Sequence, residues 1–205
     1  MSNATQRGLI RGLLITAVLA VLAFTVYIAF STLVPRSSDE AGSGQVAIGG
    51  PFELVDHNGR TVTEKDFAGR LLLVYFGFTH CPDICPTGLQ TIAIAMDQLG
   101  AAADKVQPVL ITVDPERDTP AVMKDYVQAF HERLIGLTGS PEQVAKVARE
   151  YRVYYQKVVL KDSSLGYSVD HSGFIYLMDG QGKYLAHFRH DATPEQMAER
   201  IKSKL

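Results

Sequence analysis

Charged and uncharged stretches alternate along the chain, and the longest uncharged stretch lies near its start. Residues 13–34 carry no charge, and as a helix rising about 1.5 Å per residue they would span the roughly 30 Å hydrocarbon layer of a membrane. Arg7 and Arg11 precede this stretch, and the acidic pair Asp39 and Glu40 follows it. That order of charges predicts one transmembrane helix with a cytoplasmic amino terminus and an exported carboxy-terminal part.

A cleaved secretory signal is the alternative interpretation of this stretch. Ala29-Phe-Ser31 resembles a cleavage site, but the apolar core of a signal peptide usually runs about 7–15 residues, so the length favours a retained anchor. A mitochondrial transit segment would need more than residues 1–12 ahead of the helix. We therefore expect a bacterial inner-membrane protein that crosses the membrane once and places its carboxy-terminal domain in the periplasm.

After the apolar stretch the composition changes twice. The next segment is rich in glycine and serine and poor in apolar residues, which is typical of a flexible linker. The rest reads as one folded domain. The predicted division is a short cytoplasmic amino terminus (1–12), a transmembrane anchor (13–34), a flexible linker (35–50) and the folded domain (51–205).

Within the domain, apolar runs of strand length alternate with helical patterns. Residues 52–55 and 60–63 flank the turn signal Asn58-Gly59, so they predict a β-hairpin. Residues 71–78 are apolar on both alternating faces, and residues 109–113 repeat that character. Since a helical pattern separates them, these two segments predict buried strands that pair in parallel.

Prolines indicate where the helices of the domain begin. Pro86 suits the first position of a helix that ends at Leu99, which would make Cys85 its capping residue. Three more helices are predicted to begin in the same way, at Pro120, Pro141 and Pro194.

The end of the domain predicts a second hairpin. Residues 173–178 and 183–188 are strand-like and are joined by a glycine-rich turn, so we expect an antiparallel edge to the sheet. A parallel βαβ unit, a closing hairpin and a final helix are the order of an α/β domain with a thioredoxin-like fold, here preceded by an amino-terminal β-hairpin.

Charge excludes one class of function. The 20 basic and 22 acidic residues give a formal net charge of −2, so the chain has no broad positive surface to neutralise phosphates. We expect no nucleic acid partner, and we expect a monomer.

The two cysteines of the chain, Cys81 and Cys85, follow the first buried strand directly. Thiolates bind soft metals and exchange disulfides, and a nearby helix start favours the thiolate. A merely structural disulfide is the alternative, but a bridge that closes so short a loop stabilises a fold little. A redox or copper site is therefore favoured.

The cysteine spacing separates the chemical alternatives. Thioredoxin-type oxidoreductases have two residues between their cysteines, whereas three intervene here, and a zinc site would need further strong ligands. Monovalent copper is soft and accepts two or three ligands, so two sulfurs and one imidazole suffice. His171 lies in a polar segment that we expect to be a turn before the strand at 173–178, although a solvated surface histidine is the alternative there. The six histidines are His57, His80, His131, His171, His187 and His190.

Three segments carry a resemblance to a known family. They are residues 75–86 (YFGFTHCPDICP), residues 112–120 (TVDPERDTP) and the turn Asp170-His171-Ser172. In these segments the chain resembles the Sco/SenC copper chaperones, which help to assemble the binuclear copper centre of cytochrome c oxidase. The resemblance implies a thioredoxin-like domain on one membrane anchor, with Cys81, Cys85 and His171 as the copper ligands.

The resemblance also implies a metallochaperone rather than an enzyme. Such a protein would take copper, as Cu(I) with Cu(II) also accommodated, from an upstream donor and pass it to the copper-bearing subunit of cytochrome c oxidase. Because an exported dithiol binds copper only while reduced, a thiol reductant is a further expected partner. The alternative is a thiol-disulfide reductase that keeps the copper-site cysteines of the oxidase reduced.

Asp114 and Asp118 fit a carboxylate pair of the same family. They follow the second parallel strand, so we expect them near the cysteine end of the sheet. Capping of the helix at Pro120 by Asp118 or Thr119 is one interpretation, and partner docking or tuning of the ligands is the other. His80 is a minor ligand candidate, and we expect His187 and His190 to be exposed.

Overall fold

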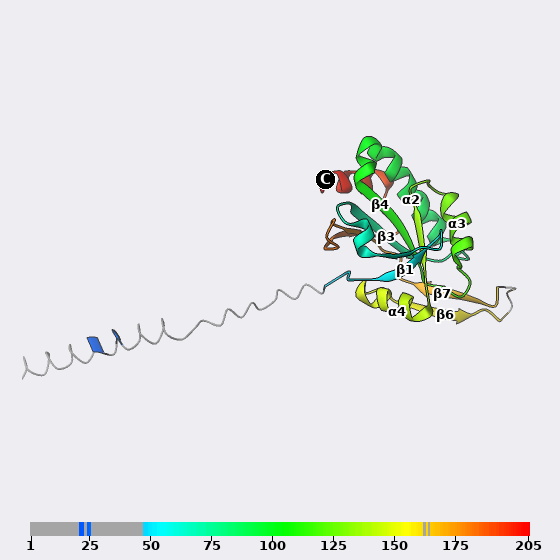
Figure 1. Cartoon of the computed structure of the whole chain (residues 1–205), viewed down its shortest axis with the longest axis horizontal. Coiled ribbons are helices and arrows are strands. Elements are labelled where there is room, and N and C mark those ends of the chain that lie inside the picture. The colour runs from blue at the N-terminus through cyan, green and yellow to red at the C-terminus, as the bar shows by residue number, and fades with distance from the viewer. Residues whose placement is uncertain (1–20, 23, 26–46, 162, 164) are drawn as a thin grey trace, which may run out of the picture. The chain divides into compact units, whose positions relative to one another are not determined.

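A computed structural model of the chain describes residues 21–22, 24–25, 47–161, 163 and 165–205 (Figure 1). The predicted anchor 13–34 and linker 35–50 therefore lie almost entirely outside the described residues. Within the described ranges, no helix combines the length and the apolar character needed to cross a membrane. Ala47–Leu205 form one compact unit.

The centre of that unit is a pair of parallel strands, β3 (Leu71–Gly77) and β4 (Val106–Thr112). Every residue of both strands is buried, as the continuous apolar runs predict for strands covered on both faces. A third parallel strand, β5 (Ile135–Thr138), pairs with β4. The sequence interpretation did not anticipate β5, because its apolar run is short. The seven-stranded sheet has the order β2-β1-β5-β4-β3-β8-β9.

Both predicted hairpins are confirmed, and they form the two edges of this sheet. The first comprises β1 (Glu53–Asp56) and β2 (Thr61–Thr63), and the second comprises β8 (Ile175–Met178) and β9 (Tyr184–Phe188). Gly59 has φ of 81°, which is the left-handed conformation that the turn between β1 and β2 requires. Since β8 pairs with β3, the second hairpin lies beside the strand that leads into the cysteines.

Helices cover both faces of the sheet. Figure 1 shows α2 (Ile84–Leu99) and α3 (Pro120–Gln128) on one side of the sheet and α4 (Pro141–Glu150) on the other. The last helix, α5 (Pro194–Lys202), packs against α2. Two short 3-10 helices, Glu64–Phe67 and Gly100–Lys105, complete the unit. This arrangement confirms the predicted α/β, thioredoxin-like domain.

Three helices begin at the predicted prolines, and one does not. Thr119, Ser140 and Thr193 each accept a hydrogen bond from a backbone N–H in the first turn of the helix that they cap. The helix expected to start at Pro86 starts at Ile84 instead, so Cys85 lies within its first turn and is not its cap. Pro86 is tolerated there because the first four N–H groups of a helix have no intrahelical partner.

A separate two-stranded sheet carries His171. It comprises β6 (Tyr155–Val159) and β7 (Tyr167–His171), which Figure 1 shows side by side. Tyr155 pairs opposite His171. The expected polar turn before the strand at 173–178 is therefore wrong, because His171 is the last residue of a strand. Most side chains of this hairpin are exposed or only partly buried. Its sequence therefore lacks the regular alternation of buried and exposed positions that would have predicted the two strands.

Candidate metal centre

Three potential ligands from three different elements meet at one end of the sheet. Cys81 lies in the loop after β3, Cys85 in the first turn of α2, and His171 at the end of β7. The two sulfurs and one ring nitrogen of His171 all lie within 4.8 Å of one another. Within the described part of the chain, this is the only group of at least three cysteine, histidine or acidic residues placed to hold a metal ion.

The loop that presents Cys81 is held by a buried carboxylate. Asp118 accepts hydrogen bonds from the Thr79 backbone N–H at 3.1 Å, the Thr79 hydroxyl at 2.6 Å and the Thr112 hydroxyl at 2.6 Å. Asp118 is fully buried, so these bonds are shielded from water. The start of the cysteine loop is thereby tied to the end of β4.

Cys85 is fully buried against β3. A Cβ atom on Gly77 would lie 3.0 Å from the Cys85 sulfur, so any larger residue there would push the sulfur out of its present position by a few tenths of an ångström. The Tyr75 hydroxyl donates a hydrogen bond to the Ile84 carbonyl at 3.2 Å, which ties the first turn of α2 to the same strand. The position of Cys85 is thus set by the core and not by the loop.

The His171 ring has a defined orientation and proton position. Its Nδ1 lies 3.1 Å from the Ser172 carbonyl, which can only accept, so Nδ1 carries the proton. Its Nε2 lies 3.2 Å from the Cys85 sulfur, and its lone pair is free to bind a metal. The rings of Tyr75 and Phe78 meet the imidazole in T-shaped contacts with centroids 6.4 Å and 5.9 Å away.

The two sulfurs differ in protonation. A hydrogen bond from the Cys85 side chain, against the opposing effect of burial and with smaller contributions from the backbone N–H groups of Asp83 and Cys85, lowers the pKa of Cys81 to about 4. The hydrogen bond to Cys81 and burial raise the pKa of Cys85 above its usual range. Near neutral pH the half-buried Cys81 is therefore a thiolate and the buried Cys85 is a thiol.

This difference predicts selective alkylation of Cys81. In the reduced, metal-free protein, iodoacetamide will modify Cys81 at a rate that changes little between about pH 6 and about pH 9, because the thiolate is already present. A free cysteine, with a pKa of about 8.5, reacts faster at each step up that range. Mass spectrometry of the modified peptides measures both sites. A rate at Cys81 that climbs steeply with pH would contradict the assigned thiolate, and denatured protein, alkylated at both cysteines, is the control.

A solvent-open hollow gives access to the centre. It has a volume of about 260 Å³ and is lined by Phe78, Cys81, Asp83, Ile84 and residues 168–171. Cys81 and His171 border this hollow, whereas Cys85 lies behind them. An incoming metal or thiol would therefore reach Cys81 and His171 before Cys85.

The carboxylate pair lies beside the centre but serves other contacts. Of the two residues expected to cap α3, Thr119 does so, which confirms that half of the capping interpretation, and Asp118 does not. Asp114 is fully buried; it forms an ion pair with Arg117 and accepts a hydrogen bond from the Tyr167 hydroxyl at 2.9 Å. Arg117 and Tyr167 were missed as contributors, since neither stands in a ligand pattern in the sequence.

The remaining histidines lie outside the group of three. His80 is exposed, and its Nδ1 lies 3.0 Å from the Thr79 hydroxyl. His187 and His190 are exposed, as expected. His57 accepts a hydrogen bond from the Gly136 N–H, and His131 lies 3.6 Å from an Asp97 oxygen, so each has another contact.

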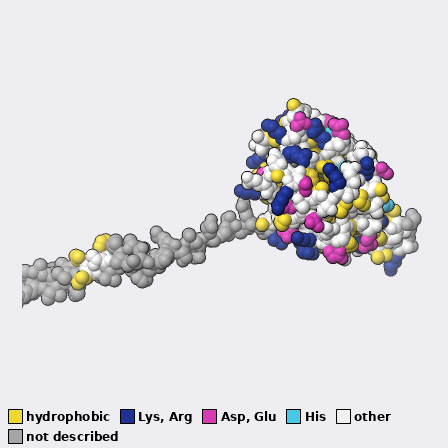
Figure 2. All heavy atoms as spheres, viewed as in Figure 1, with side chains coloured by type: hydrophobic (Ala, Val, Ile, Leu, Met, Phe, Trp, Pro, Cys, Tyr) yellow, Lys and Arg dark blue, Asp and Glu magenta, His cyan; other side chains and the backbone are white. Residues whose placement is uncertain are grey.

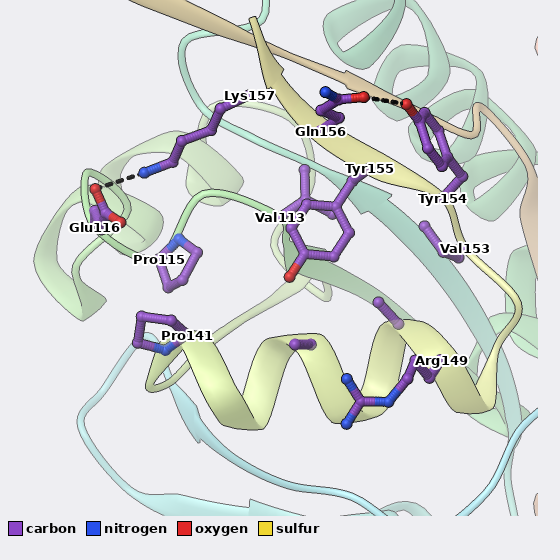
Figure 3. Close-up of a pocket in the computed structure, with 12 residues that line it drawn as sticks. Val113, Pro115, Glu116, Pro141, Arg149, Val153, Tyr154, Tyr155, Gln156 and Lys157 are labelled. Carbon is purple, nitrogen blue, oxygen red and sulfur yellow. Dashed lines mark hydrogen bonds and ion pairs between the residues drawn. The ribbon is translucent and has the colours of Figure 1, made fainter.

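A second and larger hollow, of about 500 Å³, lies between α4, the loop after β4 and β6 (Figure 3). Its lining holds no cysteine and no histidine, so it offers no soft metal ligand. An ion pair of 2.6 Å between Lys157 and Glu116 crosses one end of it. On the face of the domain that Figure 2 shows, basic and acidic side chains are intermingled.

Comparisons with known proteins point to one family. The SCO1/SenC family model matches residues 40–205. The SCO2-like protein of Rickettsia felis is 45% identical over 157 residues, which cover 77% of each chain. The mitochondrial SCO2 homolog of Mus musculus is 50% identical over 161 residues, covering 77% of this chain and 63% of the relative.

Solved structures agree with these sequence comparisons. Bradyrhizobium japonicum ScoI with copper bound has a TM-score of 0.72 and 49% identity, covering 78% of this chain and all of that one. Arabidopsis thaliana ScoI with copper bound has a TM-score of 0.73 and 46% identity, covering 77% of this chain and 98% of that one.

Proposed function

The chain belongs to the SCO1/SenC family, and we propose that it is a membrane-anchored copper chaperone that delivers copper to the binuclear copper site of cytochrome c oxidase. Cys81, Cys85 and His171 are the proposed ligands. The observation that carries the proposal is the convergence of two sulfurs and one imidazole nitrogen within 4.8 Å. The copper-bound ScoI structures that the chain resembles support copper as the cargo.

The donor set suits monovalent copper. Thiolate sulfur and imidazole nitrogen are soft or borderline ligands, and Cu(I) accepts two or three of them. The carboxylates Asp114 and Asp118 are hard ligands that are already bonded elsewhere, so they stay outside the ligand set. Cu(II) is a second form that the same mixture of sulfur and nitrogen accommodates.

Capture and release follow from the unequal exposure of the ligands. Cys81 is a half-buried thiolate that meets the incoming ion, and Cys85 then gives up its proton as its sulfur binds. His171 presents its Nε2 lone pair, since its Nδ1–H donates to the Ser172 carbonyl. Because three ligands leave copper open to a fourth, a thiolate of the acceptor can replace Cys81 first, and the copper never becomes free.

The proposal extends to the setting of the domain. Residues 13–34 anchor the protein in the bacterial inner membrane, residues 35–50 form the linker, and the domain from residue 51 lies in the periplasm. The linker lets the domain reach a membrane-bound acceptor. An upstream copper donor and a thiol reductant complete the set of proposed partners.

A thiol-disulfide reductase is the second candidate, and one observation favours it. The low pKa of Cys81 beside the protonated Cys85 is the arrangement of an attacking thiolate and a resolving thiol. Such an enzyme would use both cysteines but would not need His171 as a ligand.

Replacement of His171 separates the two candidates. We expect His171→Ala to weaken Cu(I) binding strongly while reduction of a disulfide peptide, at matched pH, continues within a few fold of the wild-type rate. Competition against a chromophoric Cu(I) chelator measures the affinity. His80→Ala is the matched control, because His80 adjoins Cys81 yet is exposed, and it should retain wild-type affinity. Full copper affinity in His171→Ala would remove this residue from the ligand set.

A further inference from the structure

A polar cluster ties the strand that carries His171 to the central sheet. We call Asp114, Arg117 and Tyr167 the Arg117 clamp. Arg117 forms an ion pair with Asp114 and donates from Nη1 to the Tyr167 carbonyl at 3.2 Å, while the Tyr167 hydroxyl donates to Asp114 at 2.9 Å. The clamp therefore closes a ring of contacts between the loop after β4 and the first residue of β7.

The clamp also reaches the imidazole through an aromatic side chain. The guanidinium carbon of Arg117 lies 3.8 Å from the Tyr167 ring centroid and 5.9 Å from the Phe78 ring centroid. Phe78 in turn meets the His171 ring edge-on, with centroids 5.9 Å apart. Arg117 is thus linked to His171 in two ways, through Tyr167 on the same strand and through the Phe78 ring.

The hairpin has little other support on this side. Of the five residues of β7 only Val169 is buried, and no residue of β6 is buried. The hollow of about 500 Å³ lies between β6 and α4 (Figure 3), and Tyr155 is the one hydrophobic residue of β6 that packs against the core. The Lys157–Glu116 ion pair at the edge of the hollow is partly exposed on both sides and is therefore a weak tie.

The clamp itself is shielded from water. The Asp114 side chain is fully buried and that of Arg117 is 18% exposed, so their ion pair and the hydrogen bonds around it are strong and directional. The planar guanidinium makes these contacts in a fixed geometry that a lysine ammonium would not reproduce. These buried contacts therefore restrict the position of β7 more than a contact between mobile surface side chains would.

We infer that Arg117, held by Asp114 and Tyr167, is a positioning residue that keeps His171 within binding distance of the two cysteine sulfurs. This inference rests on the proposed copper function and deepens it. The clamp touches no metal. Because it holds the hairpin in place before copper binds, it lowers the conformational entropy that the hairpin would otherwise lose on binding.

The first test compares two mild variants of the clamp. We expect Arg117→Lys, and Tyr167→Phe as a milder change that keeps the ring, to weaken Cu(I) binding by roughly 10–100-fold, the loss typical of groups that orient a metal ligand. In metal-free protein, the amide hydrogens of β7 should exchange faster in both variants. Unchanged affinity together with unchanged exchange would overturn the inference.

A matched control separates positioning from general stability. Arg60 pairs with the buried Asp56 at 2.7 Å in the β1–β2 hairpin, and its own side chain is 72% exposed, so Arg60→Lys alters an arginine ion pair to another buried aspartate elsewhere in the sheet. We expect Arg60→Lys to leave both the copper affinity and the exchange of β7 at wild-type values. An equal loss of affinity in Arg60→Lys would show that the clamp acts only through overall stability.

A double-mutant cycle with His171→Ala gives the decisive readout. If the clamp acts through His171, Arg117→Lys will not weaken copper binding further once the imidazole is gone. A further 10-fold loss in that background would contradict the inference. Failure of the proposed function is distinguishable, because wild-type protein would then show no cysteine-dependent copper binding, while β7 exchange in the metal-free protein still tests the clamp.

Discussion

Cys85→Ser will abolish tight Cu(I) binding and leave the domain folded. We expect the affinity to fall by more than about 100-fold, because the serine hydroxyl is a hard donor and Cu(I) prefers sulfur. This loss exceeds the one usually seen when a residue that only orients a metal ligand is replaced. Serine has nearly the same size, so the space against Gly77 stays filled. Competition with a chromophoric Cu(I) chelator measures the affinity, and thermal unfolding reports the fold.

Cys81→Ser is the companion variant for this experiment. It removes the half-buried sulfur in place of the fully buried one, and we expect an equally large loss of affinity with a smaller effect on stability. Retention of wild-type affinity by either folded variant would exclude that sulfur as a ligand. Loss in both, with His80→Ala unchanged, is the result that the proposed centre requires.

Asp118→Ala will lower the free energy of unfolding by about 3 kcal/mol, because it leaves two donors of the half-buried Thr79 and one of the buried Thr112 without this acceptor. Asp118→Asn retains an acceptor oxygen, so we expect a loss nearer about 1 kcal/mol. Urea unfolding of the metal-free protein measures both values. Equal stability of Asp118→Ala and wild type would show that these hydrogen bonds do not hold the cysteine loop.

The pH dependence of the same variants tests the burial of Asp118. Burial raises the pKa of this carboxyl above its ordinary value of 3.8, against the opposing effect of the hydrogen bonds from Thr112 and Thr79. The folded state therefore binds this proton more tightly than the unfolded state does, and the contribution of Asp118 to stability declines as the pH rises through the raised pKa. The stability difference between wild type and Asp118→Asn should narrow from about pH 4 towards neutral pH. A difference that widens would contradict the raised pKa.

The two cysteine positions show how different residues in one motif depend on different parts of the fold. Cys81 depends on a loop tied by Asp118 to the end of β4. Cys85 depends on the space that Gly77 leaves in β3. His171 depends on a hairpin that joins the sheet through Val169 and the Arg117 clamp. Substitutions in these three supports should therefore displace one ligand at a time.

Most of the regular structure could be predicted from the sequence because it is encoded locally. The apolar runs of β3 and β4, the turn at Asn58-Gly59 and the proline-led helices follow from neighbouring residues alone. The position of the cysteine pair at the end of a buried strand follows in the same way. The start of α2 was misplaced by two residues, because a proline is tolerated anywhere in the first turn and does not identify the first residue.

Only the tertiary structure decided which groups meet. His171 and Cys85 are 86 residues apart along the chain, and their contact depends on the register of β6 and β7 and on the clamp that holds this hairpin. Residue patterns in the exposed strands of the hairpin did not predict the hairpin, and His171 was placed beside the two cysteines only by the resemblance to a family. The roles of Asp114 and Asp118 were open for the same reason. Side-chain periodicity is a local property of a strand or helix, whereas a site built from distant segments depends on long-range packing that no single segment encodes.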